Sequence, residues 1–128
     1  MKKLLTLVFL ALSVTVFAQE EHEAFKKDAE LKEAFLKLDM STFMGTEVNF
    51  ICDTIDKTPH TSAALNALMK TNIQFPKNTV VKKASETNNG YVQTFGIYNK
   101  TDDALMYVRF TLNPLTGKLE EVQVERNK

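Results

Sequence analysis

The second half of the chain contains four short strand-like runs separated by turn sequences, and this spacing constrains the fold more than any other feature. The runs cover residues 79–85, 91–98, 105–112 and 118–125. The gaps between them hold Asn88-Asn89-Gly90, residues 99–103 and residues 113–117, which are rich in residues that favour turns. Because such short gaps join neighbouring antiparallel strands, the sequence predicts a four-stranded antiparallel meander.

Alternation along the third run indicates how this sheet is oriented. The residues of even number from Met106 to Leu112 are all apolar, whereas Tyr107, Arg109 and Thr111 lie between them. Successive side chains of a strand point to opposite faces, so the even-numbered set is expected to face a core and the odd-numbered set to face outward. Helices must then cover the even-numbered face.

The residues before the meander supply those helices. Residues 20–38 place apolar side chains on one helical stripe with acidic residues at the start, and a second helix is expected over residues 63–71. Residues 47–55 fit a strand or a short helix, and we favour a helix. The predicted fold class is α+β, with N-terminal helices packed on a curved four-stranded antiparallel meander.

The first eighteen residues predict export. Lys2 and Lys3 precede an uncharged apolar run, and Val16-Phe17-Ala18 is the small-residue pattern of a signal peptidase site. The run is shorter than the roughly 20 residues that span a bilayer. We therefore expect residues 1–18 to be a cleaved signal peptide, residues 19–128 to form one domain without a membrane anchor, and the protein to be periplasmic or secreted.

Charge and reactive groups exclude several classes of function. The chain has sixteen basic and sixteen acidic residues, so it lacks the basic field that nucleic-acid binding requires. The single cysteine, Cys52, forms no intrachain disulfide and is expected to be a small buried hydrophobe. No metal-binding or phosphate-binding motif occurs, and no cofactor is predicted. Asp53 and His60 are the nearest candidates for catalytic groups.

The remaining chemical signal is aromatic. Tyr91, Phe95, Tyr98 and Tyr107 are the candidate residues for a face that binds a small apolar ligand or a protein partner. By alternation, Tyr91 and Phe95 share one face of the sheet and Tyr98 lies on the other. An exposed aromatic face favours association through the sheet, including a homodimer, whereas an enclosed cavity favours a small ligand.

Two resemblances bear on the fold and function. The order of a helix, the helical segment AALNALMK and a meander ending in YVRFTLNPLTGKLEEVQV resembles the cone-shaped nuclear transport factor 2-like superfamily. That resemblance implies either a non-catalytic binding domain or an isomerase with a pocket carboxylate, for which Asp53 and Tyr98 are the nearest residues. The segment FTLNPLTGKLEEVQV is also similar to PepSY-type domains, with Asn113 in place of their acidic residue.

These observations favour an exported, non-enzymatic binding domain. The alternatives are an isomerase-like or hydrolase-like enzyme of the cone fold that uses Asp53 or His60, and a protease-inhibitor-like module. An enzyme needs a carboxylate or imidazole within reach of a substrate position, whereas an inhibitor needs a protruding hairpin or an open sheet edge.

Overall fold

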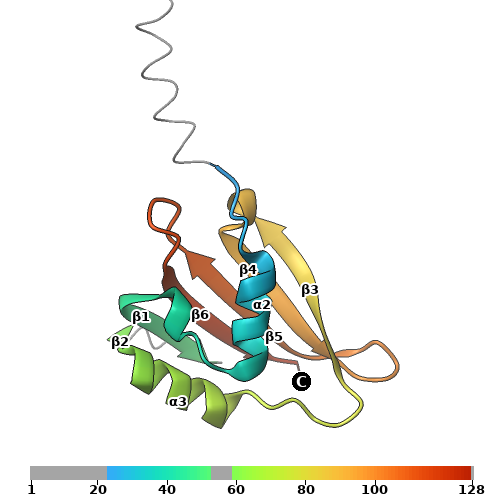
Figure 1. The fold of residues 1–128 in the computed structure, drawn as a ribbon. Coiled ribbons are helices and arrows are strands. Elements are labelled where there is room, and N and C mark those ends of the chain that lie inside the picture. Colours follow the sequence, from blue (N-terminus) through green and yellow to red (C-terminus); the bar gives the residue numbers. More distant parts are fainter. Residues whose placement is uncertain (1–22, 53–58, 128) are drawn as a thin grey trace, which may run out of the picture.

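A computed structural model describes residues 23–52 and 59–127 of the protein, which form an α+β fold (Figure 1). The predicted signal peptide and Asp53 lie outside the described residues. In chain order the elements are α2 (Asp28–Lys37), a 3₁₀ turn (Ser41–Phe43), β1 (Met44–Cys52), β2 (Pro59–His60), α3 (Ser62–Asn72), β3 (Val80–Thr87), a 3₁₀ turn (Asn88–Gly90), β4 (Val92–Tyr98), β5 (Ala104–Leu112) and β6 (Leu119–Arg126). No helix in the described ranges is long and apolar enough to cross a membrane.

The strands form one mixed sheet in the order β2-β1-β6-β5-β4-β3. Strands β3 to β6 pair with their sequence neighbours in antiparallel fashion, as the turn sequences predict. The prediction of four strands was incomplete, because β1 adds to β6 in parallel and β2 pairs with β1. Register shifts between each pair of strands from β3 to β6 bend the sheet, since a bulge increases local twist.

The predicted helix over residues 47–55 was wrong, because residues 44–52 form strand β1. Val48 and Phe50 point into the core, and Phe50 is paired in register with Val122 of β6. This pairing stabilises an extended conformation that the local sequence leaves ambiguous. Cys52, at the end of β1, is half-buried rather than fully buried, and its Sγ lies 3.6 Å from Oδ1 of Asn72 at the end of α3.

The first described helix is shorter than predicted. Helix α2 begins at Asp28, and residues 23–27 run as irregular chain along the 3₁₀ turn 88–90, where the Phe25 N–H donates to the Asn89 carbonyl oxygen over 2.7 Å. Gly90 has φ +89°, and a Cβ there would lie 3.2 Å from the Cβ of Phe25. Glycine therefore permits both the turn and the close approach of the N-terminal segment.

Both helices cover the same face of the sheet (Figure 1). Helix α2 contributes Leu31, Ala34 and Phe35 to the core, and α3 contributes Leu65 and Met69. These side chains pack on the even-numbered residues of β5, so the predicted core face is confirmed.

Aromatic rings fill the centre of this core. The ring of Phe35 lies 5.6 Å from that of Phe95 and 5.3 Å from that of Phe110, and these separations are typical of packed aromatic pairs. Within residues 23–52 and 59–127, Gln93 is the single buried polar side chain, and its Nε2 donates to the Gly90 carbonyl oxygen over 3.0 Å.

Candidate functional site

The fold distributes the four candidate aromatic residues over three environments. Phe95 is 1% exposed and packs between Phe35 and Phe110 in the core. Tyr91 is buried at one end of the sheet beside Phe25. Tyr98 and Tyr107 are half-buried on the face of the sheet that points away from the helices. The predicted ligand or partner face is thus not a single surface.

The outward face of β4, β5 and β6 is a mixed aromatic and charged surface, which we call the open face. Its central row aligns Thr94, Arg109 and Gln123 across the three strands. The Arg109 guanidinium donates to Oε1 of Gln123 and lies 3.9 Å from a carboxylate oxygen of Glu121. These cross-strand contacts hold the arginine extended across the sheet.

Tyr98 and Tyr107 meet edge to face on the same surface. Their ring centroids lie 6.4 Å apart, with an interplanar angle of 86°. The ring of Tyr98 lies back over Gly96, where an added Cβ would come within 2.6 Å of it. The absence of a side chain at Gly96 therefore allows the ring to lie against the strand.

A lysine and a carboxylate complete this cluster. The Lys82 ammonium lies 4.5 Å from the centre of the Tyr98 ring and 2.6 Å from an oxygen of Asp102. The hydrogen bond to Asp102 raises the pKa of Lys82. Burial, followed by the neighbouring Tyr107, raises the pKa of Tyr98, so this phenol stays protonated above its ordinary range.

Of the catalytic candidates Asp53 and His60, the structure describes His60 alone. His60 lies on the two-residue strand β2, paired with Val48. Among residues 23–52 and 59–127, no hydrogen bond or ion pair involves the His60 side chain. In the same ranges no three histidine, cysteine or acidic side chains lie close enough together to hold a metal ion.

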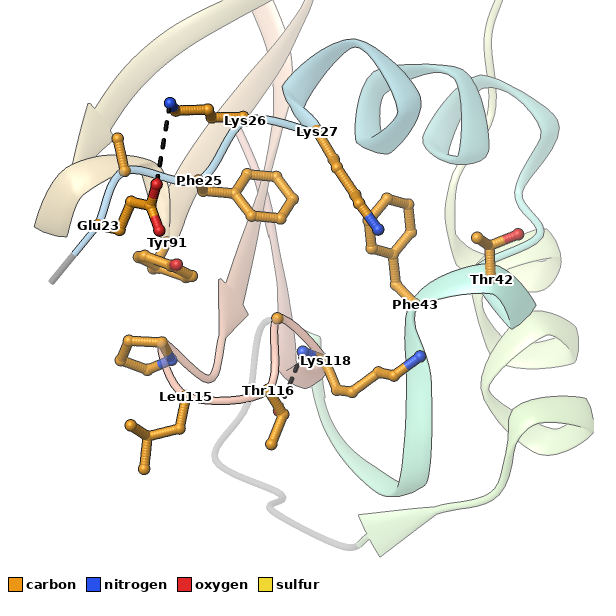
Figure 2. A pocket seen from close by; sticks show the side chains of 13 residues that line it. Glu23, Phe25, Lys26, Lys27, Thr42, Phe43, Tyr91, Leu115, Thr116 and Lys118 are labelled. Carbon is orange, nitrogen blue, oxygen red and sulfur yellow. Dashed lines mark hydrogen bonds and ion pairs between the residues drawn. The ribbon is translucent and has the colours of Figure 1, made fainter. Parts of the chain in front are cut away.

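A groove at the end of the sheet that carries the β5–β6 turn is the second candidate site (Figure 2). Its volume is about 420 Å³. We call it the aromatic groove, because Phe25, Phe43 and Tyr91 form its base. The ring of Phe25 lies 6.2 Å from that of Phe43 and 5.7 Å from that of Tyr91.

Charged residues and the β5–β6 turn surround this aromatic base. Lys27 and Lys118 extend toward Phe43, and Lys26 pairs with Glu23 over 3.9 Å (Figure 2). Residues 114–118 of the β5–β6 turn form the opposite wall, where the side chain of Leu115 is 69% exposed. The sequence did not predict the groove, because four separate segments of the chain supply its residues.

Comparison of the sequence with protein-family models and with curated proteins gives no match. The fold is similar to the crystal structure of a DUF4783 family protein from Bacteroides ovatus. The two chains share 11% identity at a TM-score of 0.51, over 74% of this chain and 93% of the other. The epoxide hydrolase/cyclase-like enzyme SalBIII, described in pyran ring formation in polyether salinomycin, shares 14% identity at a TM-score of 0.49, over 79% of this chain and 90% of that enzyme.

The similarity to the DUF4783 family protein shows a shared fold alone. At this identity, the resemblance to the nuclear transport factor 2-like superfamily stays a prediction. The resemblance to PepSY-type domains has no support from these comparisons.

Proposed function

We propose that this protein is an exported, non-enzymatic binding domain that associates with a second copy of itself through the open face of its sheet. The pattern of residues 1–18 supports export. The half-buried pair of Tyr98 and Tyr107 on the open face is the observation that carries the proposed association.

The chemistry of the open face favours a protein partner. Tyrosine and arginine are enriched where proteins bind one another, since each combines a large contact surface with hydrogen-bonding groups. Tyr107 and Arg109 are successive outward residues of β5, and Tyr98 lies beside them on β4. Together they form a continuous surface on two adjacent strands.

Charge complementarity favours a second copy as that partner. The open face has a basic group at Arg109 and acidic groups at Glu121 and Glu125, and the ammonium group of Lys82 on β3 lies over its Tyr98 ring. In a two-fold symmetric contact the same surface faces itself, so a face that contains both signs can pair each charge with its opposite. A face of one sign would repel its copy.

The packing of the inner face disfavours a small apolar ligand beneath the helices. Phe35, Phe95 and Phe110 occupy this position and contact one another. A ligand there would have to displace core side chains, which typically stabilise a protein by about 3–5 kcal/mol each.

The features that protect edge strand β3 disfavour the inhibitor-like alternative. Strand β3 lies at one edge of the sheet, where strand addition by a protease would occur. A register shift between Lys83 and Ser85 interrupts its pairing, and Lys82 and Lys83 place two charges there. Bulges and lysines are features that protect edge strands from pairing with another chain.

Sedimentation equilibrium tests the association. We expect a dimer for the unchanged protein and a monomer for Tyr107→Glu, because the new carboxylate would be buried against its symmetry mate. Leu36→Glu is the matched control, since Leu36 is exposed on the outer side of α2 and the variant should remain dimeric. A monomer for the unchanged protein at high micromolar concentration would exclude the proposal.

The mass of the intact protein recovered from the cell envelope or the medium tests export. We expect a chain that begins at Gln19. Recovery of a chain that retains residues 1–18 would mean that the segment is not cleaved.

A further inference from the structure

The aromatic groove lies apart from the open face and has a different chemical character. Its base consists of the rings of Phe25, Phe43 and Tyr91, which present apolar surface to the groove. Its volume of about 420 Å³ falls within the range of small-molecule sites. Phe43 and Tyr91 are buried, so the protein core fixes their positions.

Two of the three lysines that line the groove have no carboxylate partner among the described residues. Within the described residues, Lys26, Lys37, Lys82 and Lys83 each pair with a carboxylate. Lys27 and Lys118 have no such pair in the same ranges, although both line the groove and extend toward Phe43 (Figure 2). Two ammonium groups without an ion pair thus lie beside an apolar surface, and Glu23 pairs with the third lysine of the groove.

The backbone holds both walls of the groove in place. The contact between Phe25 and Asn89 fixes one wall. In the other wall, the Asn113 side chain accepts a hydrogen bond from the Leu115 N–H over 2.7 Å, and the Gly117 N–H donates to the Asn113 carbonyl oxygen over 2.7 Å. Gly117 has φ +70°, which suits glycine at this turn. Walls that are fixed before binding lower the entropic cost of holding a ligand.

We propose that the aromatic groove binds a small organic carboxylate with a flat aromatic body. The rings of Phe25, Phe43 and Tyr91 contact the body, and the ammonium groups of Lys27 and Lys118 pair with the carboxylate. This site goes beyond the proposed association, because its residues belong to a different surface of the molecule.

Titration of the purified protein with 2-naphthoate, followed by ¹H–¹⁵N NMR, tests the site. We expect saturable shifts in the amide signals of Phe25, Phe43, Tyr91 and residues 115–118. The uncharged analogue 2-naphthalenemethanol should bind about tenfold more weakly, because it cannot pair with the lysines. Equal affinity for the two probes, or shifts confined to other residues, would overturn the proposal.

Lysine variants distinguish the effect of the lysine charges on affinity from an effect on folding. Lys27→Gln and Lys118→Gln should each raise the Kd for 2-naphthoate about fivefold and leave that for the alcohol unchanged. Lys100→Gln is the matched control, because Lys100 is exposed in the β4–β5 turn and the change should leave both affinities as they are. An equal loss in the control would reveal a general effect of net charge and contradict the assignment.

Binding of 2-naphthoate in the aromatic groove should be independent of the association through the open face. Tyr107→Glu should bind 2-naphthoate with the affinity of the unchanged protein, even where it is monomeric. Loss of 2-naphthoate binding in Tyr107→Glu would contradict the separation of the two surfaces.

Discussion

The two faces of the sheet use aromatic residues in opposite ways, although the residues alternate along the same strands. On the inner face, Phe95 and Phe110 are at most 1% exposed and pack against Phe35 of α2. On the open face, Tyr98 and Tyr107 contact each other and remain half-exposed. Phenylalanine has no polar group to satisfy, whereas tyrosine retains a hydroxyl that favours water or a partner.

This comparison separates stability from binding within a single element. In β5 the even-numbered residues from 106 to 112 are buried and contribute to stability, whereas the odd-numbered residues face outward and are available for binding. Changes to the inner face should therefore alter the free energy of unfolding, and changes to the open face should alter association.

The largest expected effect is at Phe110. Phe110→Ala should lower the free energy of unfolding by about 3–5 kcal/mol, because the deleted ring leaves a cavity beside Phe35 and Phe95. Thr111→Ala, one residue further along and on the opposite face, should cost less than about 1 kcal/mol. Urea denaturation of both variants measures this difference, and equal costs would show that the register of β5 is wrong.

A smaller effect is expected at Gly96. Gly96→Ala places a Cβ where the Tyr98 ring lies, so the ring must swing away from Tyr107 and Lys82. We expect a loss of about 1 kcal/mol in stability and a weaker dimer. In a Tyr98→Ala background the same substitution should be close to neutral, and a double-mutant cycle measures the coupling. A coupling energy of zero would contradict the placement of the ring.

The smallest effect concerns pH. The pKa of Tyr98 is raised in the folded protein by burial and by Tyr107, above its ordinary value of 10.0. Between that value and the folded pKa, the unfolded chain loses this proton and the native state keeps it. The contribution of Tyr98 to the free energy of unfolding is therefore complete below pH 10 and is lost as the pH rises through the pKa of Tyr98 in the folded protein. Ultraviolet titration should show one tyrosine that ionises at a higher pH than the others, and this ionisation should be absent in Tyr98→Phe. An unchanged titration curve of that variant at high pH would contradict the raised pKa of Tyr98.

The sequence predicted the parts of the fold whose signals are local. The turns at residues 88–90 and 113–117 and the alternation along β5 lie within short segments, so the antiparallel pairs follow directly. Strand β1 was missed because its partner β6 lies far along the chain, and parallel pairing leaves no turn signal between them. The start of α2 was missed for a similar reason. Residues 23–27 pack against the turn at Gly90 rather than forming a helix, and their helical periodicity does not reveal this contact.

The candidate surfaces were predictable in part. Alternation predicted that Tyr98 and Phe95 lie on opposite faces of the sheet, as the pairing of β4 with β5 confirms. The aromatic groove could not be predicted from the sequence, because Phe25, Phe43 and Lys118 come from segments whose proximity depends on the assembled fold. The sequence offers one sign of it, Gly90, because the absence of a side chain there allows Phe25 to approach the turn closely.

Disulfide cross-linking tests the division between the two faces most directly. In a Cys52→Ser background, a single cysteine is introduced on the central row of the open face, as Thr94→Cys, Arg109→Cys or Gln123→Cys, and on the helical side as Glu33→Cys. Residues near a two-fold axis meet their own copy, so at least one open-face variant should form a covalent dimer rapidly under mild oxidation, while Glu33→Cys should not. Cross-linking of all three open-face variants no faster than that of Glu33→Cys would contradict association through this face.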